Sequence, residues 1–115
     1  MQELEKKTYN FSVQGIGFIK SIDKNYPGLD MDTRELKQDM GAVSLKFIAA
    51  MDSKENDDFA NNLRECHNKA MMSSKQLKKL DKLKENTLET QKNDLIREAE
   101  EITEQLDKIL EKLIY

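Results

Sequence analysis

Apolar and small residues recur in alternating steps of four and three over two long stretches of the chain. The first series is Phe59, Leu63, Cys66, Ala70, Ser73, Leu77 and Leu80, and the second is Leu95, Ala99, Ile102, Leu106, Ile109 and Leu113. This spacing places each series on one face of an α-helix. Two such seams are buried by packing helix on helix, so the pattern predicts an all-α fold.

The amino-terminal half contains two shorter amphipathic segments, separated by the turn at Pro27. That proline is the only one among 115 residues, and a sheet protein would need many more turn residues. We predict a flexible lead over residues 1–7 and helices at about 8–25, 32–51, 54–84 and 90–114. Short links between four helices favour one domain over residues 8–115, an antiparallel up-down-up-down four-helix bundle. A helical hairpin that dimerises as a coiled coil is the alternative.

Several apolar side chains lie off the main seams. These residues are Phe18, Leu45, Ile48, Met71 and Met72. A small monomer has difficulty covering them all, so they predict a homo-oligomer interface. Exposed apolar residues that occur singly are normal on protein surfaces, and this remains the alternative interpretation.

No constellation of residues predicts catalysis or metal binding. Cys66 and His67 are consecutive on a helix and therefore point about 100° apart, and Cys66 lies on the apolar seam. A single histidine cannot supply a di-iron bundle site, and one cysteine with one histidine does not complete a zinc site. No phosphate-binding glycine loop is present. We expect a non-enzymatic protein with no metal and no cofactor.

A cluster of lysines lies at the end of the third predicted helix. It comprises Lys75, Lys78, Lys79, Lys82 and Lys84, and the first four have the spacing of one helix face. Such a stripe predicts contacts with nucleic-acid phosphates. The alternative is that these lysines are solvated, favour the helix dipole or pair with the acidic fourth helix. The net charge of −3 argues against a general binder of polyanions.

The sequence carries no long apolar run and no amino-terminal signal pattern. Its single cysteine cannot form an internal disulfide, which fits a reducing compartment. We therefore expect a cytoplasmic protein that does not span a membrane.

Five short pieces of the chain follow the order seen in a known bacterial family. They are residues 23–27 (DKNYP), 42–45 (AVSL), 52–55 (DSKE), 70–77 (AMMSSKQL) and 109–114 (ILEKLI). Over about residues 9–114 the chain resembles the four-helix bundle family of 23S-rRNA intervening-sequence proteins and retroelement accessory variability determinant (Avd-like) proteins. The Ser-Ile-x-x-Asn-Ile-Ala-Glu-Gly stretch of the first branch is echoed only by Ser44, Leu45 and Ala50, which favours the second branch.

This resemblance implies a pentameric ring of four-helix protomers. It also implies an accessory or scaffold role for a nucleic-acid-processing partner, such as a diversity-generating retroelement reverse transcriptase, with RNA or DNA contacted by the lysine cluster. The alternative function is a protein-only helical interaction module that binds no nucleic acid.

Overall fold

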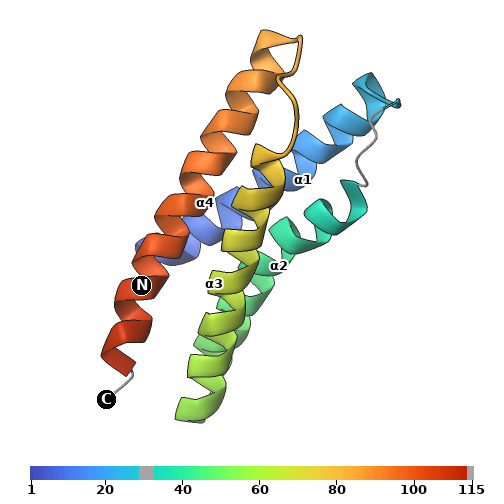
Figure 1. Cartoon of the computed structure of the whole chain (residues 1–115). Helices are drawn as coiled ribbons and strands as arrows, with labels where there is room; N and C mark the ends of the chain where they lie inside the picture. The colour runs from blue at the N-terminus through green and yellow to red at the C-terminus, as the bar shows by residue number, and fades with distance from the viewer. Residues whose placement is uncertain (29–32, 114–115) are drawn as a thin grey trace.

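The computed structural model describes residues 1–28 and 33–113 and contains four helices in this part of the chain. They are α1 (Gln2–Asn25), α2 (Thr33–Asp52), α3 (Asn56–Lys78) and α4 (Asn86–Leu113). Each helix packs against the next, and α4 returns to pack against α1 (Figure 1). The bundle measures 46 × 22 × 19 Å. The predicted all-α four-helix architecture is confirmed.

The two heptad-like seams form the centre of the core. Leu63, Cys66 and Leu77 of α3 are fully buried, as are Ala99 and Leu106 of α4. At the outer ends of the seams, Phe59, Ile109 and Leu113 are only partly buried against the core. No helix among the described residues has the length and hydropathy needed to cross a bilayer.

Helix α1 begins at Gln2, so the predicted flexible lead over residues 1–7 is corrected. Leu4 is 4% exposed and Thr8 is 1% exposed, and both continue the four-three spacing of the α1 core face back from Phe11. The Thr8 hydroxyl donates a hydrogen bond to the carbonyl of Glu5 at 3.0 Å. The sequence pattern did not reveal this first part of the helix because a polar residue, Thr8, occupies a core position. The position tolerates Thr because its hydroxyl forms a hydrogen bond within the helix.

The link between α3 and α4 also differs from the prediction. Helix α3 spans Asn56–Lys78 rather than about 54–84, and α4 begins at Asn86 rather than about residue 90. At the start of α3, the Ser53 hydroxyl donates to the carbonyl of Ala49 at 2.8 Å and caps no amide of α3. The predicted helix ends at residues 32 and 114 lie outside the described residues.

Helices α1 and α2 cross closely where small residues meet. The Ser12 hydroxyl donates to the carbonyl of Met40 at 2.6 Å and accepts from the amide of Ser44 at 3.0 Å. A Cβ on Gly15 would lie only 2.6 Å from Sδ of Met40, which explains why glycine stands there. The crossing therefore fixes α1 against α2 by both backbone contact and a buried polar bridge.

Candidate nucleic-acid interface

The segment between α3 and α4 is an ordered loop, residues 79–85, that still contributes to the core. Leu80 and Leu83 are 5% and 4% exposed, whereas Lys79, Lys82 and Lys84 are exposed. This burial explains why the seam spacing appeared to continue beyond Lys78: Leu80 covers the core from a loop. The loop turns its leucines inward and leaves its lysines in solvent.

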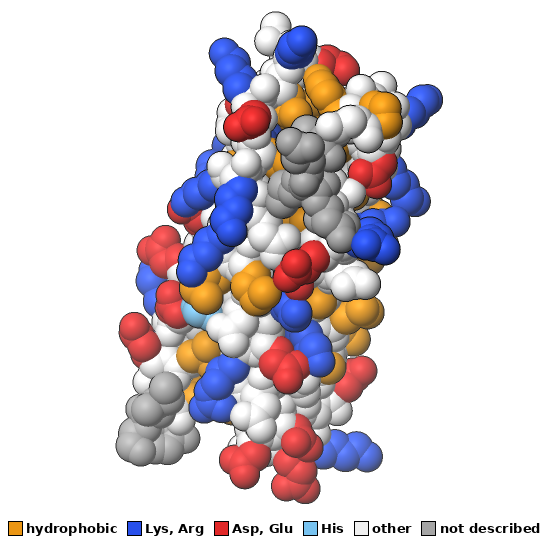
Figure 2. Space-filling view, turned by 45° about the vertical axis from the view of Figure 1, so that its right-hand side comes forward, with side chains coloured by type: hydrophobic (Ala, Val, Ile, Leu, Met, Phe, Trp, Pro, Cys, Tyr) orange, Lys and Arg blue, Asp and Glu red, His pale blue; other side chains and the backbone are white. Residues whose placement is uncertain are grey.

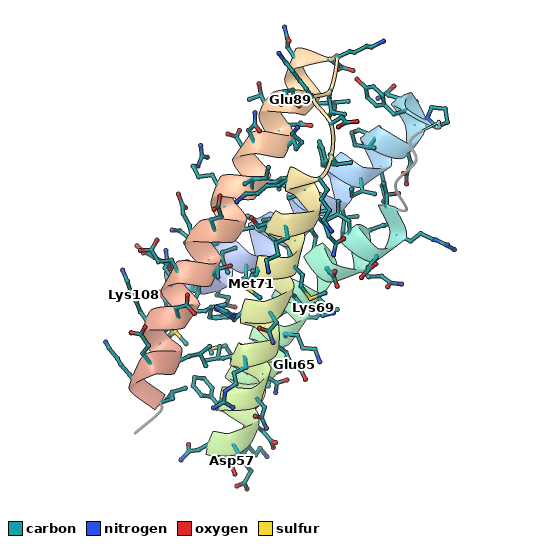
Figure 3. The ribbon with its side chains drawn as sticks, viewed as in Figure 1. Asp57, Glu65, Lys69, Met71, Glu89 and Lys108 are labelled. Atoms are coloured by element: carbon teal, nitrogen blue, oxygen red, sulfur yellow. The ribbon has the colours of Figure 1, made fainter. Side chains whose placement is uncertain are left out.

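Two side chains of the first turns of α4 hold this loop. Glu89 accepts the backbone amide of Leu83 at 2.9 Å. Lys92 is 6% exposed, and its Nζ lies 2.9 Å from Oε1 of Glu89 and 3.3 Å from the carbonyl oxygen of Leu80. Figure 3 shows Glu89 at the upper end of α4, beside the loop. The buried ammonium is thus neutralised by a carboxylate and satisfies a loop carbonyl, so the loop has a defined shape.

The hydrogen bond from the Leu83 amide, followed by the interaction with Lys92, lowers the pKa of Glu89 from its ordinary value. A lowered pKa means that the ionised carboxylate is the form that the folded loop prefers. Glu89 therefore remains a charged acceptor for the loop at neutral pH.

The carboxyl-terminal end of α1 lies against the same loop. The phenolic oxygen of Tyr26 accepts the amide of Glu85 at 3.2 Å. Lys24 stands in the last turn of α1 and is exposed. This end of the bundle, which we call the basic end, combines Lys79, Lys82 and Lys84 of the loop with Lys24 of α1.

The other two predicted lysines lie on α3 itself. Lys75 and Lys78 line a groove of about 390 Å³ between α3 and α4, together with Glu100 and Glu104. Nζ of Lys78 lies 3.3 Å from Oε2 of Glu100, with both side chains 54% exposed. Ion pairing with α4, one alternative left open by the sequence, therefore holds for Lys78. Within the described residues no carboxylate lies within ion-pair distance of the other four lysines.

The prediction of one helical lysine stripe is therefore wrong in its geometry. Because α3 ends at Lys78, Lys82 does not continue the face that carries Lys75 and Lys78. The structure instead separates a pair beside α4 from a triplet on the loop. All five side chains are exposed. Their contact with phosphate stays a prediction.

Charge is distributed unevenly along the bundle. In Figure 2, Lys and Arg side chains gather over the upper part of the view, while acidic side chains predominate at the bottom. The first turn of α3 carries Asp57 and Asp58, and Figure 3 shows Asp57 at the end opposite to Glu89. A net charge of −3 thus coexists with a group of exposed lysines at one end, although Asp81 and Glu85 of the same loop are exposed too and offset part of their charge.

The predicted oligomer residues do not form one surface. Phe18 is only 3% exposed and belongs to the core of the protomer, which corrects its assignment to an interface. Leu45 and Ile48 of α2 are 68% and 45% exposed. Met71 and Met72 of α3 are partly buried, and Met71 lines the α3/α4 groove. Leu45 and Ile48 remain as exposed apolar side chains.

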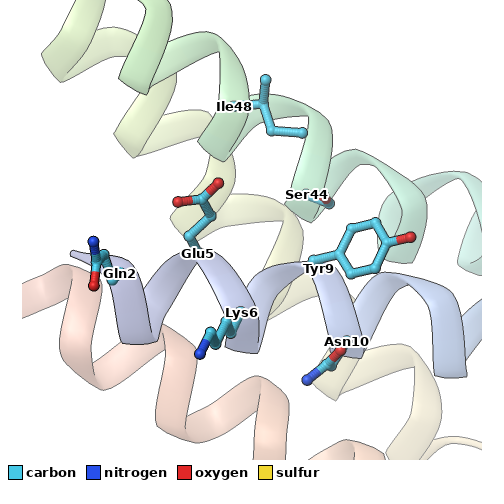
Figure 4. Close-up of a pocket in the computed structure, with 7 residues that line it drawn as sticks. All are labelled: Gln2, Glu5, Lys6, Tyr9, Asn10, Ser44 and Ile48. Carbon is cyan, nitrogen blue, oxygen red and sulfur yellow. The ribbon is translucent and has the colours of Figure 1, made fainter.

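Sequence reasoning missed three exposed apolar residues beside these two. Tyr9 and Val13 of α1 are 58% and 51% exposed, and Met51 of α2 is 37% exposed. With Leu45 and Ile48 they form what we call the α1/α2 apolar face. Tyr9 and Ile48 line a groove of about 500 Å³ between the two helices (Figure 4). These three residues could have been identified from the sequence as exposed, because they lie off the buried seam of their helices.

Cys66 and His67 lie on different sides of α3. The Cys66 thiol is buried, donates to the carbonyl of Val43 at 3.2 Å, and has its pKa raised to about 12 by desolvation. Nε2 of His67 lies 2.6 Å from Oδ1 of Asp107, outside hydrogen-bonding geometry. The predicted divergence of the pair is confirmed. No cluster of three metal-binding side chains occurs in the described part of the chain.

No protein-family model and no curated protein matches the sequence. A solved structure does share the fold: a protein with unknown function from the S23 ribosomal protein family, from Bacteroides thetaiotaomicron VPI-5482. It matches with a TM-score of 0.81 and 16% sequence identity, over 93% of this chain and 97% of that one. At this identity the likeness shows a common four-helix architecture across almost the whole of both chains.

Proposed function

We propose that this protein is a non-enzymatic, homo-oligomeric accessory or scaffold for a protein that acts on nucleic acid, and that its basic end contacts the phosphate backbone. The observation that carries the proposal is the ordered loop 79–85. Glu89 and Lys92 fix its backbone, while Lys79, Lys82 and Lys84 extend into solvent without an ion-pair partner among the described residues. A prearranged set of cations loses less conformational entropy when it meets phosphates.

Two features support phosphate contact over base recognition. The described basic side chains are lysines, which act as point charges without the planar fork of arginine. No aromatic residue is interleaved with the lysines of the loop, and the hydroxyl of Tyr26 beside it already accepts the amide of Glu85, so base stacking is not favoured. The structural likeness to a protein from the S23 ribosomal protein family agrees with the family resemblance of the sequence, although it carries the fold alone.

Binding of RNA and DNA duplexes and single strands should be measured against salt concentration. The test variant replaces Lys79, Lys82 and Lys84 with Gln. The matched control replaces three other exposed lysines with Gln, at the end of the bundle opposite to the basic end: Lys54, Lys108 and Lys112. The wild type and the control should share a steep salt dependence. In the test variant, the slope of log K against log salt should become less steep by about two to three, because three phosphate contacts are lost. Equal binding by all three proteins would contradict phosphate contact at the basic end.

The α1/α2 apolar face supports self-association. Its five side chains are all more than a third exposed and lie on two adjacent helices. Burial of one such side chain contributes about 1.5–3 kcal/mol. A surface of this kind on a chain of 13.4 kDa is stabilised by a second copy, and the family resemblance implies a ring of five.

Light scattering should give a mass that is a multiple of 13.4 kDa for the wild type. Leu45→Lys should shift the mass toward the monomer, because it places an ammonium group in the apolar face. Gln38→Lys adds the same charge at another exposed position of α2 and should leave the mass unchanged. A monomeric wild type would rule out the oligomer.

The groove between α1 and α2 favours a second candidate function, a protein-only interaction module. Tyr9 and Ile48 supply apolar surface to this groove, and Glu5, Lys6 and Asn10 also line it (Figure 4). An amphipathic helix of a partner protein fits such a surface. This candidate predicts partner binding that survives the triple lysine substitution and is lost in Ile48→Lys.

A further inference from the structure

The seam between α1 and α4 is the least closed side of the bundle, because these helices share less contact than the other neighbouring pairs. A groove of about 470 Å³ follows this seam and continues into a second of about 190 Å³, and Gln14 and Glu98 line both. Gly17 lies in the wall of the larger groove, and no atom of another helix stands within 4 Å of the position that its Cβ would take. The α1/α4 groove therefore has room for a side chain from outside.

Glu98 is an anion without a donor in this groove. Its Oε2 is covered from solvent and accepts no hydrogen bond from the described residues. Desolvation by burial raises the pKa of Glu98, with further increases from the charges of Asp94 and Glu101 and an opposing effect of Arg97. A desolvated carboxylate gains more from an added donor than an exposed one does.

The cations nearest to Glu98 are engaged elsewhere. Nη1 of Arg97 lies 3.3 Å from Oδ1 of Asp94, and its Nε lies 3.8 Å from Oε1 of Glu101. Lys7, facing the seam from α1, has its Nζ 3.8 Å from Oε2 of Glu101. The groove therefore holds three carboxylates against two cations, and both cations pair with the other two carboxylates.

We infer that the α1/α4 groove receives a helix of the partner protein and that a Lys or Arg side chain of this helix pairs with Glu98. The partner protein is the one required by the proposed function. Charge complementarity selects the occupant, since a cation offsets the desolvation of Glu98. The alkyl stem of a Lys or Arg side chain lies along the wall formed by Phe18 and Leu95. Gly17 permits close approach of a helix, as small residues do at helix contacts.

The first experiment adds a small-molecule analogue of the arginine side chain to the protein. Its binding is detected through the amide chemical shifts in NMR spectra. We expect n-butylguanidinium, at millimolar concentrations, to shift the amides around Gly17 and Glu98 and to lower the pKa of the Glu98 carboxyl. Butanol, the neutral control, should do neither. Equal effects of the two compounds, or none from the cation, would overturn the assignment of Glu98 as a cation site.

The second experiment uses a synthetic amphipathic helical peptide with one Lys every seventh position and a matched peptide with Gln there. The Lys peptide should bind at least tenfold more tightly than the Gln peptide. Glu98→Gln should abolish this preference, while Glu111→Gln, an exposed position on the same helix, should keep it within twofold. Binding of n-butylguanidinium without preference for the Lys peptide would reduce the groove to a small-cation site and overturn helix docking.

Two further measurements separate helix docking in this groove from nonspecific attraction and from phosphate contact at the basic end. Preference for the Lys peptide should weaken as the pH falls through the raised pKa of Glu98, because protonation removes the charge. Gly17→Leu should prevent peptide binding, because the added side chain fills the groove. The circular dichroism spectrum should remain that of a helical protein, since this side chain enters open space. The Lys79/Lys82/Lys84→Gln variant should bind the peptide normally, so failure of phosphate contact and failure of this groove give different results.

Discussion

The α2/α3 seam and the α1/α4 seam differ in how they satisfy their carboxylates. In the first, Asp39 is 3% exposed and accepts hydrogen bonds from Lys69 Nζ at 3.0 Å and Gln76 Nε2 at 2.6 Å. In the second, Oε2 of Glu98 is covered and has no donor among the described residues. The α2/α3 seam is a closed internal interface, whereas the α1/α4 seam is less tightly packed and leaves Glu98 without a donor among the described residues.

The two carboxylates differ both in burial and in partners: Asp39 is buried and accepts two hydrogen bonds, whereas Glu98 is half-buried and has no donor among the described residues. A satisfied polar group fixes the relative positions of two helices, and an unsatisfied one lowers stability until a donor arrives. Substitutions at the two seams and at the loop test this comparison.

The largest effect is expected at Asp39. Asp39→Ala leaves Lys69 and Gln76 without their shared acceptor, but Lys69 is 35% exposed and regains water. We expect a loss of about 2–3 kcal/mol in the free energy of unfolding, below the range for a fully buried pair. Urea denaturation measures it. Asp94→Ala, which breaks an exposed pair with Arg97, should cost about 0.5 kcal/mol or less. Equal losses would remove the distinction between closed and open seams.

A matched pair of glycines on α1 gives the next effect. Gly15→Ala places a methyl group 2.6 Å from Sδ of Met40, at the tight crossing with α2, and should destabilise by about 1–2 kcal/mol. Gly17→Ala adds the same methyl group in open space beside α4 and should stabilise by about 0.5–1 kcal/mol through helix propensity. Thermal unfolding of the two variants should shift in opposite directions. A loss at Gly17 would show that the α1/α4 groove is closed.

Glu89 extends the comparison to a partnered carboxylate on α4 itself. Glu89→Gln weakens the acceptor of the Leu83 amide, so hydrogen exchange at that amide should accelerate about fivefold or more. Because the pKa of Glu89 is lowered in the folded state, its contribution is present above the ordinary value of 4.5 and is lost as pH falls through the folded pKa. Unchanged exchange would mean that Glu89 does not hold the loop.

Glu98 should show the opposite pH dependence and the smallest effect. Its pKa is raised in the folded state, so its relative stabilisation is present below the ordinary value of 4.5 and is lost as pH rises through the folded pKa. Glu98→Gln should therefore match the wild type near pH 4 and slightly exceed its stability at neutral pH, since solvent screening keeps the effect small at a half-buried position. A variant that is less stable than the wild type at neutral pH would show that Glu98 does have a donor. The difference between Glu98 and Asp39 would then disappear.

The fold was largely predictable because periodicity reports burial directly. The seams of α3 and α4 reached the core as expected at residues such as Leu63, Leu77 and Leu106. The helix boundaries were less predictable. Leu80 keeps the seam spacing although it lies in a loop, since burial does not require helical backbone. Thr8 concealed the first turns of α1 because a self-satisfied hydroxyl can occupy a core position.

The candidate site was predictable only in part. The sequence located a group of lysines, but their division into Lys75 and Lys78 beside α4 and a triplet on the loop depends on where α3 ends. The loop that follows this end is held by Glu89 and Lys92, which look in sequence like an ordinary helix-surface pair. Phe18, by contrast, follows the four-three spacing of the α1 core face from Phe11 through Gly15, so its burial could have been predicted from the sequence.

By itself, the sequence determined that the chain forms amphipathic helices and which face of each helix is buried, because these properties follow from residue spacing and side-chain transfer free energies. Only the tertiary structure decided which buried polar groups find partners. Asp39 meets donors from α3, while Glu98 meets none from α1, where Gly17 leaves open space. Hydrogen bonds are short and directional, so they depend on helix positions that no pattern along a single chain specifies.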